Sequence, residues 1–192
     1  SLPKGLYDKL RKRHPDLTLK DCQLVAHGLR QFFLAHLKSG RQFVSMPSQV
    51  ADDLWHEFIL HTRNYEVFCR RTFGRFLHHT PAVAVGGHDK ADAGLRRTWW
   101  WCCKEDHINP RKPSRLPLLF ALDAKLGVAQ GFRYALDCQS AMATRGEEGG
   151  TSTSVVYCGG DMASSCGSSD GGSGDGGSSD GGGDGGGCGG GD

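Results

Sequence analysis

The sequence predicts an all-α fold for most of the chain, with about six helices and a small irregular or β-hairpin subregion. Apolar residues recur at helical spacing, and helix start and stop residues flank the apolar stretches. From residue 159 onward the chain is glycine, serine, aspartate and cysteine apart from Met162 and Ala163, so it has almost no apolar surface. We therefore expect a helical globular domain over residues 1–158 and a disordered glycine-rich tail over residues 159–192.

Two helices are expected before residue 41. Residues 2–13 form a short amphipathic segment that a His-Pro pair ends, because proline disfavours helical backbone at the residue before it. Thr18 then precedes a long apolar stripe with Asp21 in its first turn, which is typical of a capped helix start. Gly40 ends this second helix.

The next two helices are expected within residues 46–81, MPSQVADDLWHEFILHTRNYEVFCRRTFGRFLHHTP. No other segment combines so many candidate metal ligands with so many bulky apolar side chains. Ser48 is a helix-start residue, and the apolar residues after it follow helical spacing. Thr62 or Asn64 can begin the following helix, which Gly74 ends.

Two further helices are expected in the second half of the domain. Asp92 begins the first, which runs through the WWWCC segment at residues 99–103. Ser114 caps the second, Pro117 lies in its first turn, and Gly127 ends it.

Beyond these helices, residues 131–138 and 155–158 can form two short strands, and a small hairpin joining Cys138 to Cys158 is one arrangement for them. The eight cysteines are not paired at the CxxC spacing, which argues against a zinc ribbon or a redox dithiol motif.

The overall charge excludes some classes of partner. A formal net charge of +2 gives no strong field for nucleic acid or membrane, so we predict no nucleic-acid partner. No signal peptide or membrane span is visible in the sequence. We expect a cytoplasmic protein with an unknown protein partner, or one tethered to the membrane and facing the cytoplasm if an anchor precedes Ser1.

A candidate metal site lies within residues 46–81. His56 follows Asp52 by four residues and Asp53 by three, so either carboxylate shares its helix face. His78 and His79 follow the end of the next helix. Imidazole and carboxylate ligands suit a divalent metal such as Zn, or Fe. We predict a site made by His56, Asp52 or Asp53, and His78 or His79.

Three segments carry a resemblance to a known family: residues 46–81, then INPRKPSRLPLLFALDAKL and GFRYALDC, followed by the tail rich in glycine. They resemble the bacterial glycine-rich domain-containing proteins of uncharacterised function, over most of residues 1–160. This resemblance implies the helical fold and the tail, and it implies no activity.

A remoter similarity is to plant glycine-rich domain proteins, which share an Asp-x-x-Trp-His helix, a following Tyr, and a Gly before a His. The matching positions here are Asp52 or Asp53, Trp55, His56, Tyr65, Gly74, and His78 or His79. Phe58 stands where a second His often follows in the plant proteins. That departure weakens any metal ligand implied by the similarity.

Three functional hypotheses follow. The first is a non-enzymatic interaction or scaffold module, a helical domain with a flexible acidic tail, because no complete catalytic set is visible. The second is a metal-binding helical domain that uses the site above. The third is a metallohydrolase, since residues 56–61 read HExxxH. Positions five apart differ by ~140° around a helix, against ~40° in HExxH, so His56 and His61 reach one ion only on a distorted helix.

Overall fold

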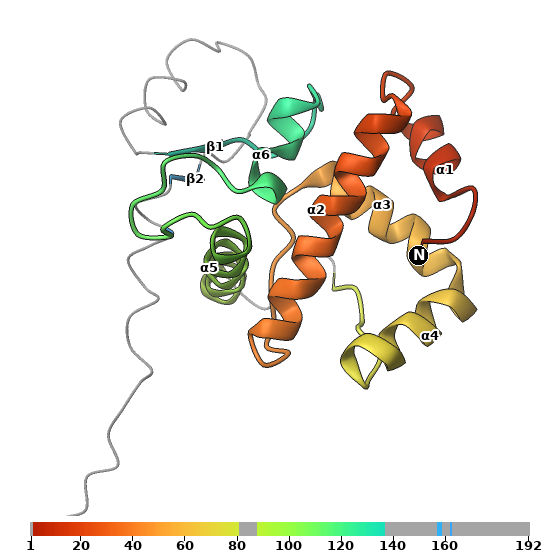
Figure 1. Cartoon of the computed structure of the whole chain (residues 1–192), viewed down its shortest axis with the longest axis horizontal. Helices are drawn as coiled ribbons and strands as arrows, with labels where there is room; N and C mark the ends of the chain where they lie inside the picture. Colours follow the sequence, from red (N-terminus) through yellow and green to blue (C-terminus); the bar gives the residue numbers. More distant parts are fainter. Residues whose placement is uncertain (1, 81–87, 137–156, 159–161, 163–192) are drawn as a thin grey trace, which may run out of the picture.

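The computed structural model describes residues 2–80, 88–136, 157–158 and 162, and within them it confirms the predicted all-α fold (Figure 1). The elements are α1 (Leu6–Arg13), α2 (Leu19–Lys38), α3 (Gln49–Leu60), α4 (Thr62–Phe73), α5 (His88–Glu105), α6 (Leu118–Lys125), β1 (Tyr134–Ala135) and β2 (Tyr157–Cys158). The predicted tail over residues 159–192 lies outside the described residues except for Met162, as does Cys138 of the suggested hairpin.

Helix α2 is the element around which the others pack. It contacts α1, α3, α5 and α6, and it crosses the middle of the molecule in Figure 1. Its start is the predicted capping box: the Asp21 backbone N–H donates to Thr18 Oγ1 at 3.2 Å, and the Thr18 N–H donates to Asp21 Oδ2 at 2.9 Å. Gly28 permits close approach of α6, because a Cβ there would collide with the Leu122 side chain.

The start of α3 is held by a buried carboxylate from another helix. Asp123 of α6 is 1% exposed and accepts hydrogen bonds from Ser48 Oγ (2.7 Å) and from the backbone N–H groups of Gln49 (2.8 Å) and Val50 (3.2 Å). Its Oδ2 also accepts from the Phe132 N–H at 2.8 Å. The N–H groups of Gln49 and Val50 belong to the first turn of α3, where no carbonyl of the same helix can accept a hydrogen bond from them. The carboxylate therefore fixes the start of α3 against α6.

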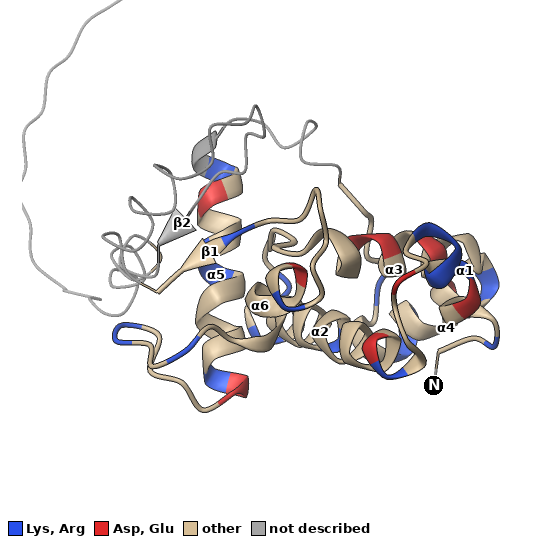
Figure 2. Ribbon diagram, turned by 90° about the horizontal axis from the view of Figure 1, so that it is seen from above, with Lys and Arg blue, Asp and Glu red and all other residues tan. Residues whose placement is uncertain are grey.

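The opposite side of α3 packs on α1. Arg13, at the end of α1, donates from Nη1 to Asp53 Oδ1 at 2.6 Å, and His14 Nε2 lies 2.8 Å from Asp53 Oδ2. Figure 2 shows basic residues of α1 beside acidic residues of α3. Helix α3 is thus held by α6 at its start and by α1 along its flank.

The start of α6 differs from the prediction. The helix begins at Leu118 after Pro117, and Ser114 does not cap it. The Leu118 N–H instead donates to Asp106 Oδ2 at 2.8 Å, and the Leu119 N–H donates to Gln31 Oε1 at 3.0 Å. Side chains distant in sequence therefore replace a local cap.

Three other boundaries or pairings differ from the prediction. Helix α1 begins at Leu6 and not at residue 2, because Gly5 before it has a left-handed backbone (φ 81°). Helix α5 begins at His88, before Asp92. Strands β1 and β2 pair in parallel, with Tyr134 opposite Tyr157, so this subregion is not a hairpin. Among the residues described, no helix combines the length and apolar character needed to cross a membrane.

We predict that Asp123→Ala lowers the free energy of unfolding by about 3–5 kcal/mol, because it leaves buried donors at the start of α3 without an acceptor. Urea denaturation followed by circular dichroism measures this. Asp16→Ala is the matched control: Asp16 is exposed and has no partner among the described residues, so its change should stay within about 0.5 kcal/mol. Equal losses for the two variants would contradict this role of Asp123.

Candidate metal centre

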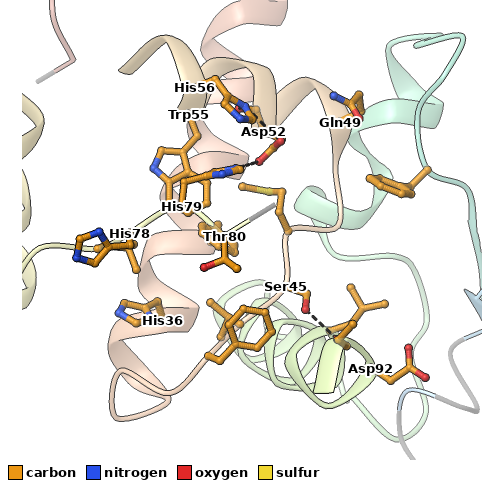
Figure 3. Close-up of a pocket in the computed structure, with 18 of the residues that line it drawn as sticks. His36, Ser45, Gln49, Asp52, Trp55, His56, His78, His79, Thr80 and Asp92 are labelled. Carbon is orange, nitrogen blue, oxygen red and sulfur yellow. Dashed lines mark hydrogen bonds and ion pairs between the residues drawn. The ribbon is translucent and has the colours of Figure 1, made fainter. Parts of the chain in front are cut away.

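Two segments bring candidate ligands to one wall of a cavity (Figure 3). Helix α3 carries Asp52 in its first turn and His56 one turn later, and the chain that follows α4 carries His79. Gly74, with a left-handed φ of 73°, ends α4 and turns the chain back towards α3. The cavity has a volume of about 550 Å³.

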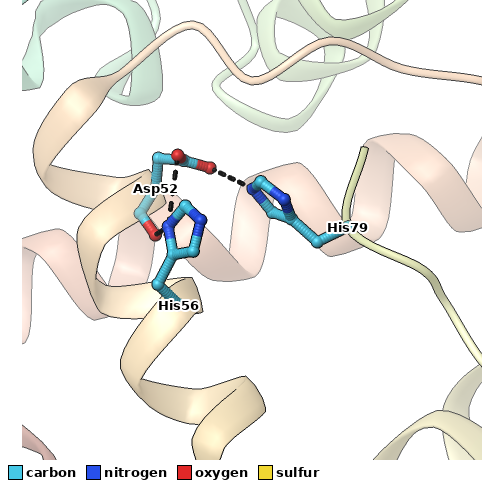
Figure 4. Close-up of side chains that lie close together, drawn as sticks. All are labelled: Asp52, His56 and His79. Atoms are coloured by element: carbon cyan, nitrogen blue, oxygen red, sulfur yellow. Dashed lines mark hydrogen bonds and ion pairs between the residues drawn. The ribbon is translucent and has the colours of Figure 1, made fainter. Parts of the chain in front are cut away.

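Asp52 joins the two histidines (Figure 4). Its Oδ1 lies 2.9 Å from His79 Nε2, and its Oδ2 lies 3.3 Å from His56 Nδ1. The two imidazole rings are 4.2 Å apart between centroids. The side chains of Asp52, His56 and His79 are 20%, 45% and 15% exposed, so solvent reaches the group from the His56 side.

The spacing of this group fits one metal ion. One ligand atom from each of the three residues lies within 4.8 Å of the others, and no other such group of three occurs among the described residues. Bonds of about 2.0–2.2 Å place the ligand atoms of a single ion about 3–4 Å apart. Small side-chain rotations therefore suffice to bring Asp52, His56 and His79 onto one ion.

The hydrogen bonds define which nitrogen is free. His56 Nδ1 lies 2.9 Å from the Asp52 backbone oxygen, and because a carbonyl only accepts, Nδ1 donates and Nε2 keeps its lone pair. A bond of this kind commonly orients a ligating histidine. His79 Nε2 donates to the Asp52 carboxylate, so an ion bound there would take the place of that proton.

A buried hydrogen-bond chain positions the segment that carries His79. Trp55 Nε1 donates to the Tyr65 hydroxyl at 3.1 Å, and that hydroxyl donates to the Leu77 carbonyl at 2.6 Å. Burial raises the pKa of Tyr65, which keeps the hydroxyl as a donor. The Trp55 ring also packs against His79, with centroids 4.7 Å apart. Trp55 and Tyr65 lie within the segment predicted to carry the site, but no sequence pattern indicates the hydrogen bonds between them.

The alternatives Asp53 and His78 lie outside the group of three ligands, although His78 also lines the cavity. Asp53 is 5% exposed and bonds to Arg13 and His14, so it joins α3 to α1. His78 is exposed and packs beside Phe76, with ring centroids 4.9 Å apart. Consecutive residues point about 100° apart around a helix, so Asp52 and Asp53 cannot both face His79.

The HExxxH string does not assemble into a site. Glu57 Oε1 lies 3.9 Å from Arg13 Nη2, on the side of α3 that faces α1. His61 lies at the junction between α3 and α4. His56 meets Asp52 and His79, and neither Glu57 nor His61 belongs to a ligand group in the part of the chain described here.

His36 of α2 also lines the cavity and is 5% exposed. Its Nδ1 lies 3.1 Å from the Gln42 carbonyl. Burial lowers the pKa of His36, and the nearby Arg75 and Arg41 lower it further, against the effect of the Gln42 bond. No pattern in the sequence assigns His36 to the cavity.

The comparisons with known proteins identify one family. The family model described as UCP032817-like matches residues 1–162. No curated protein and no solved structure shows a significant match to the chain.

We predict that acid weakens the fold partly through His36. The unfolded chain binds a proton at a histidine near pH 6.5, whereas the folded state keeps His36 neutral to lower pH. The unfolded state therefore binds more protons, and the free energy of unfolding falls as pH drops below ~6.5.

Urea denaturation between pH 7.5 and 5 should show a smaller fall for His36→Gln than for the wild type. His27→Gln, on the exposed side of α2, serves as the control. An identical pH dependence in wild type and His36→Gln would contradict the prediction.

Proposed function

The chain belongs to the UCP032817-like family, and from its candidate site we propose that it is a divalent-metal-binding protein. Asp52, His56 and His79 would hold the ion. The observation that carries the proposal is the convergence of these side chains from two segments separated by α4. The likeness to bacterial and plant glycine-rich domain proteins remains a prediction.

Two imidazoles and one carboxylate favour Zn²⁺ or Fe²⁺ over Mg²⁺ or Ca²⁺, which prefer oxygen ligands. Three protein ligands leave at least one coordination position for water or another molecule. An ion bound there would act as a Lewis acid towards oxygen ligands. The proposal assigns metal binding to the protein and assigns no reaction.

The described helices give no support for a cysteine nucleophile. Their four cysteines, Cys22, Cys69, Cys102 and Cys103, are all buried. Burial raises the pKa of Cys102, and it raises that of Cys103 to about 12. These thiols therefore remain protonated at neutral pH.

Metal titration tests the proposal directly. Purified full-length protein, stripped with a chelator, should bind one equivalent of Zn²⁺ or Co²⁺ in isothermal titration calorimetry. His56→Ala and His79→Ala should each weaken binding by more than about 100-fold, beyond the 10–100-fold typical of losing an outer-shell partner. Asp52→Asn should also weaken binding, because it removes the anionic ligand.

Three controls separate this site from other ligands. His78→Ala and His61→Ala should leave the affinity unchanged within about twofold, since neither residue belongs to the ligand group. A Cys166→Ser, Cys188→Ser double variant tests whether the tail binds the metal. Unchanged metal affinity in His79→Ala, or loss of binding in the tail variant alone, would reject the proposed centre.

A second candidate function, the interaction module, is favoured by a separate groove between α2 and α4. The groove has a volume of about 1000 Å³, with an apolar floor that includes Phe33, Phe58 and Phe68. Arg63 and Arg71 line it, and neither has an ion-pair or hydrogen-bond partner among the described residues. Among the described residues, none that lines the groove is acidic. An amphipathic helix with acidic flanks is the partner that this surface suits.

A display library of helical peptides, selected on the full chain, tests the groove. We predict enrichment of sequences with apolar residues at i, i+3, i+4 and i+7 beside acidic residues. In an Arg63→Glu, Arg71→Glu double variant, the affinity for these peptides should fall by at least about tenfold. Arg70→Glu is the control, because Arg70 already pairs with Glu66 outside the groove. Peptides without acidic residues, or equal binding by both variants, would contradict the second candidate.

A further inference from the structure

The cavity beside the metal centre is large enough for a small organic molecule. Its volume of about 550 Å³ falls within the range of about 300–1,000 Å³ typical of small-molecule sites. Asp52, His56 and His79 form part of its wall (Figure 3). Much of the remaining lining is apolar and includes Phe43, Met46 and Leu95. An ion at the centre would therefore meet an apolar space on one side.

The apolar wall is fixed in place before any ligand arrives. Three hydrogen bonds join the segment 43–45 to α5: Arg97 Nη1 donates to the Phe43 carbonyl (2.6 Å), Thr98 Oγ1 to the Ser45 carbonyl (2.8 Å), and Ser45 Oγ to the Ala91 carbonyl (2.8 Å).

Gly94 of α5 lets this segment approach closely. A Cβ there would lie 2.5 Å from Ser45 Oγ and 2.7 Å from Phe43 Cε1, both too short for any side chain. Phe43 consequently lies against α5 in a defined position. A wall built in this way is preorganised for an apolar group.

The charges of the site define the head group of a ligand. A divalent ion bound to one carboxylate and two neutral imidazoles keeps one net positive charge. Arg41 and Asp92 also line the cavity and carry opposite charges. The remaining positive charge lies at the ion, where an anionic oxygen donor can fill the open coordination positions.

On this basis, and resting on the proposed metal centre, we infer that the protein binds a small monoanionic oxygen chelator whose apolar, ring-sized body lies against Phe43 and Leu95. The ion supplies the attachment point, and the apolar wall supplies the selectivity for the body of the ligand. Metal binding and ligand selection are thus separate properties of one site, carried by different residues.

Cobalt-loaded full-length protein provides the test, because ligand exchange at Co²⁺ changes its visible absorption spectrum. The probes are acetohydroxamate and benzohydroxamate, which share one chelating anion and differ in their apolar body. After correction for their affinities for free Co²⁺, we expect benzohydroxamate to bind at least about tenfold tighter, since its phenyl ring is removed from water. Equal corrected affinities would overturn the inference.

A matched pair of variants tests where the phenyl ring of benzohydroxamate binds. Phe43→Ala should reduce the preference for benzohydroxamate by at least about fivefold and leave Co²⁺ affinity unchanged. Phe68→Ala is the control: Phe68 is half-buried like Phe43 but lines the groove between α2 and α4. Equal effects of the two variants would contradict the assignment of the ring to this wall.

The design separates the two proposals. If Co²⁺ does not bind, the metal centre fails and the chelator site fails with it. If Co²⁺ binds while neither hydroxamate changes the spectrum, the centre stands and the chelator site is rejected. If Phe43→Ala does not fold, Ala91→Leu replaces it: the added bulk inside the cavity should exclude benzohydroxamate and still admit acetohydroxamate.

Discussion

The carboxylate of Asp123 at the first turn of α3 is the contact on which the candidate site depends. A helix start leaves backbone N–H groups without partners, and here a buried acid from α6 accepts from two of them and from the Ser48 hydroxyl. Negative charge is favourable at this end of a helix. Because Asp52 lies in the same first turn, the contact that joins α6 to α3 also fixes the start of the helix face that carries the candidate ligands.

The two adjacent acids of α3 divide between structure and site. Asp53 faces α1, where Arg13 and His14 satisfy its oxygens. Asp52 faces the cavity and meets two histidines. The helical rotation between neighbours makes this division unavoidable once α1 covers one flank. Asp53 holds the helix against α1, and Asp52 is left as a candidate metal ligand.

The sequence predicted the elements better than their partners. The Thr18 start of α2, the Ser48 start of α3 and the Gly74 end of α4 follow local rules of capping and left-handed glycine, so they were correctly placed. The start of α6 was misplaced because Gln31 and Asp106, distant in sequence, take the role expected of Ser114. No local sequence pattern indicates a cap formed by side chains from other elements.

For the candidate site too, the sequence predicted which segments meet but not which of their side chains interact. Helical periodicity placed an acid beside His56, and the chain after Gly74 supplied a histidine, so the pairing of the two segments followed from sequence. The choice of Asp52 over Asp53 could not be predicted from the sequence, because it depends on which flank of α3 is covered by α1. The choice of His79 over His78 depends on the hydrogen bond from Tyr65 to the Leu77 carbonyl. The cavity wall at Phe43 was missed because it requires the approach of α5 at Gly94.

Anomalous diffraction from crystals of the cobalt-loaded protein would locate the ion itself. We expect one strong peak about 2.0–2.2 Å from the Asp52 carboxylate and from one nitrogen of each of His56 and His79. A peak on other side chains, or these three residues still hydrogen-bonded to one another with the metal elsewhere, would contradict it.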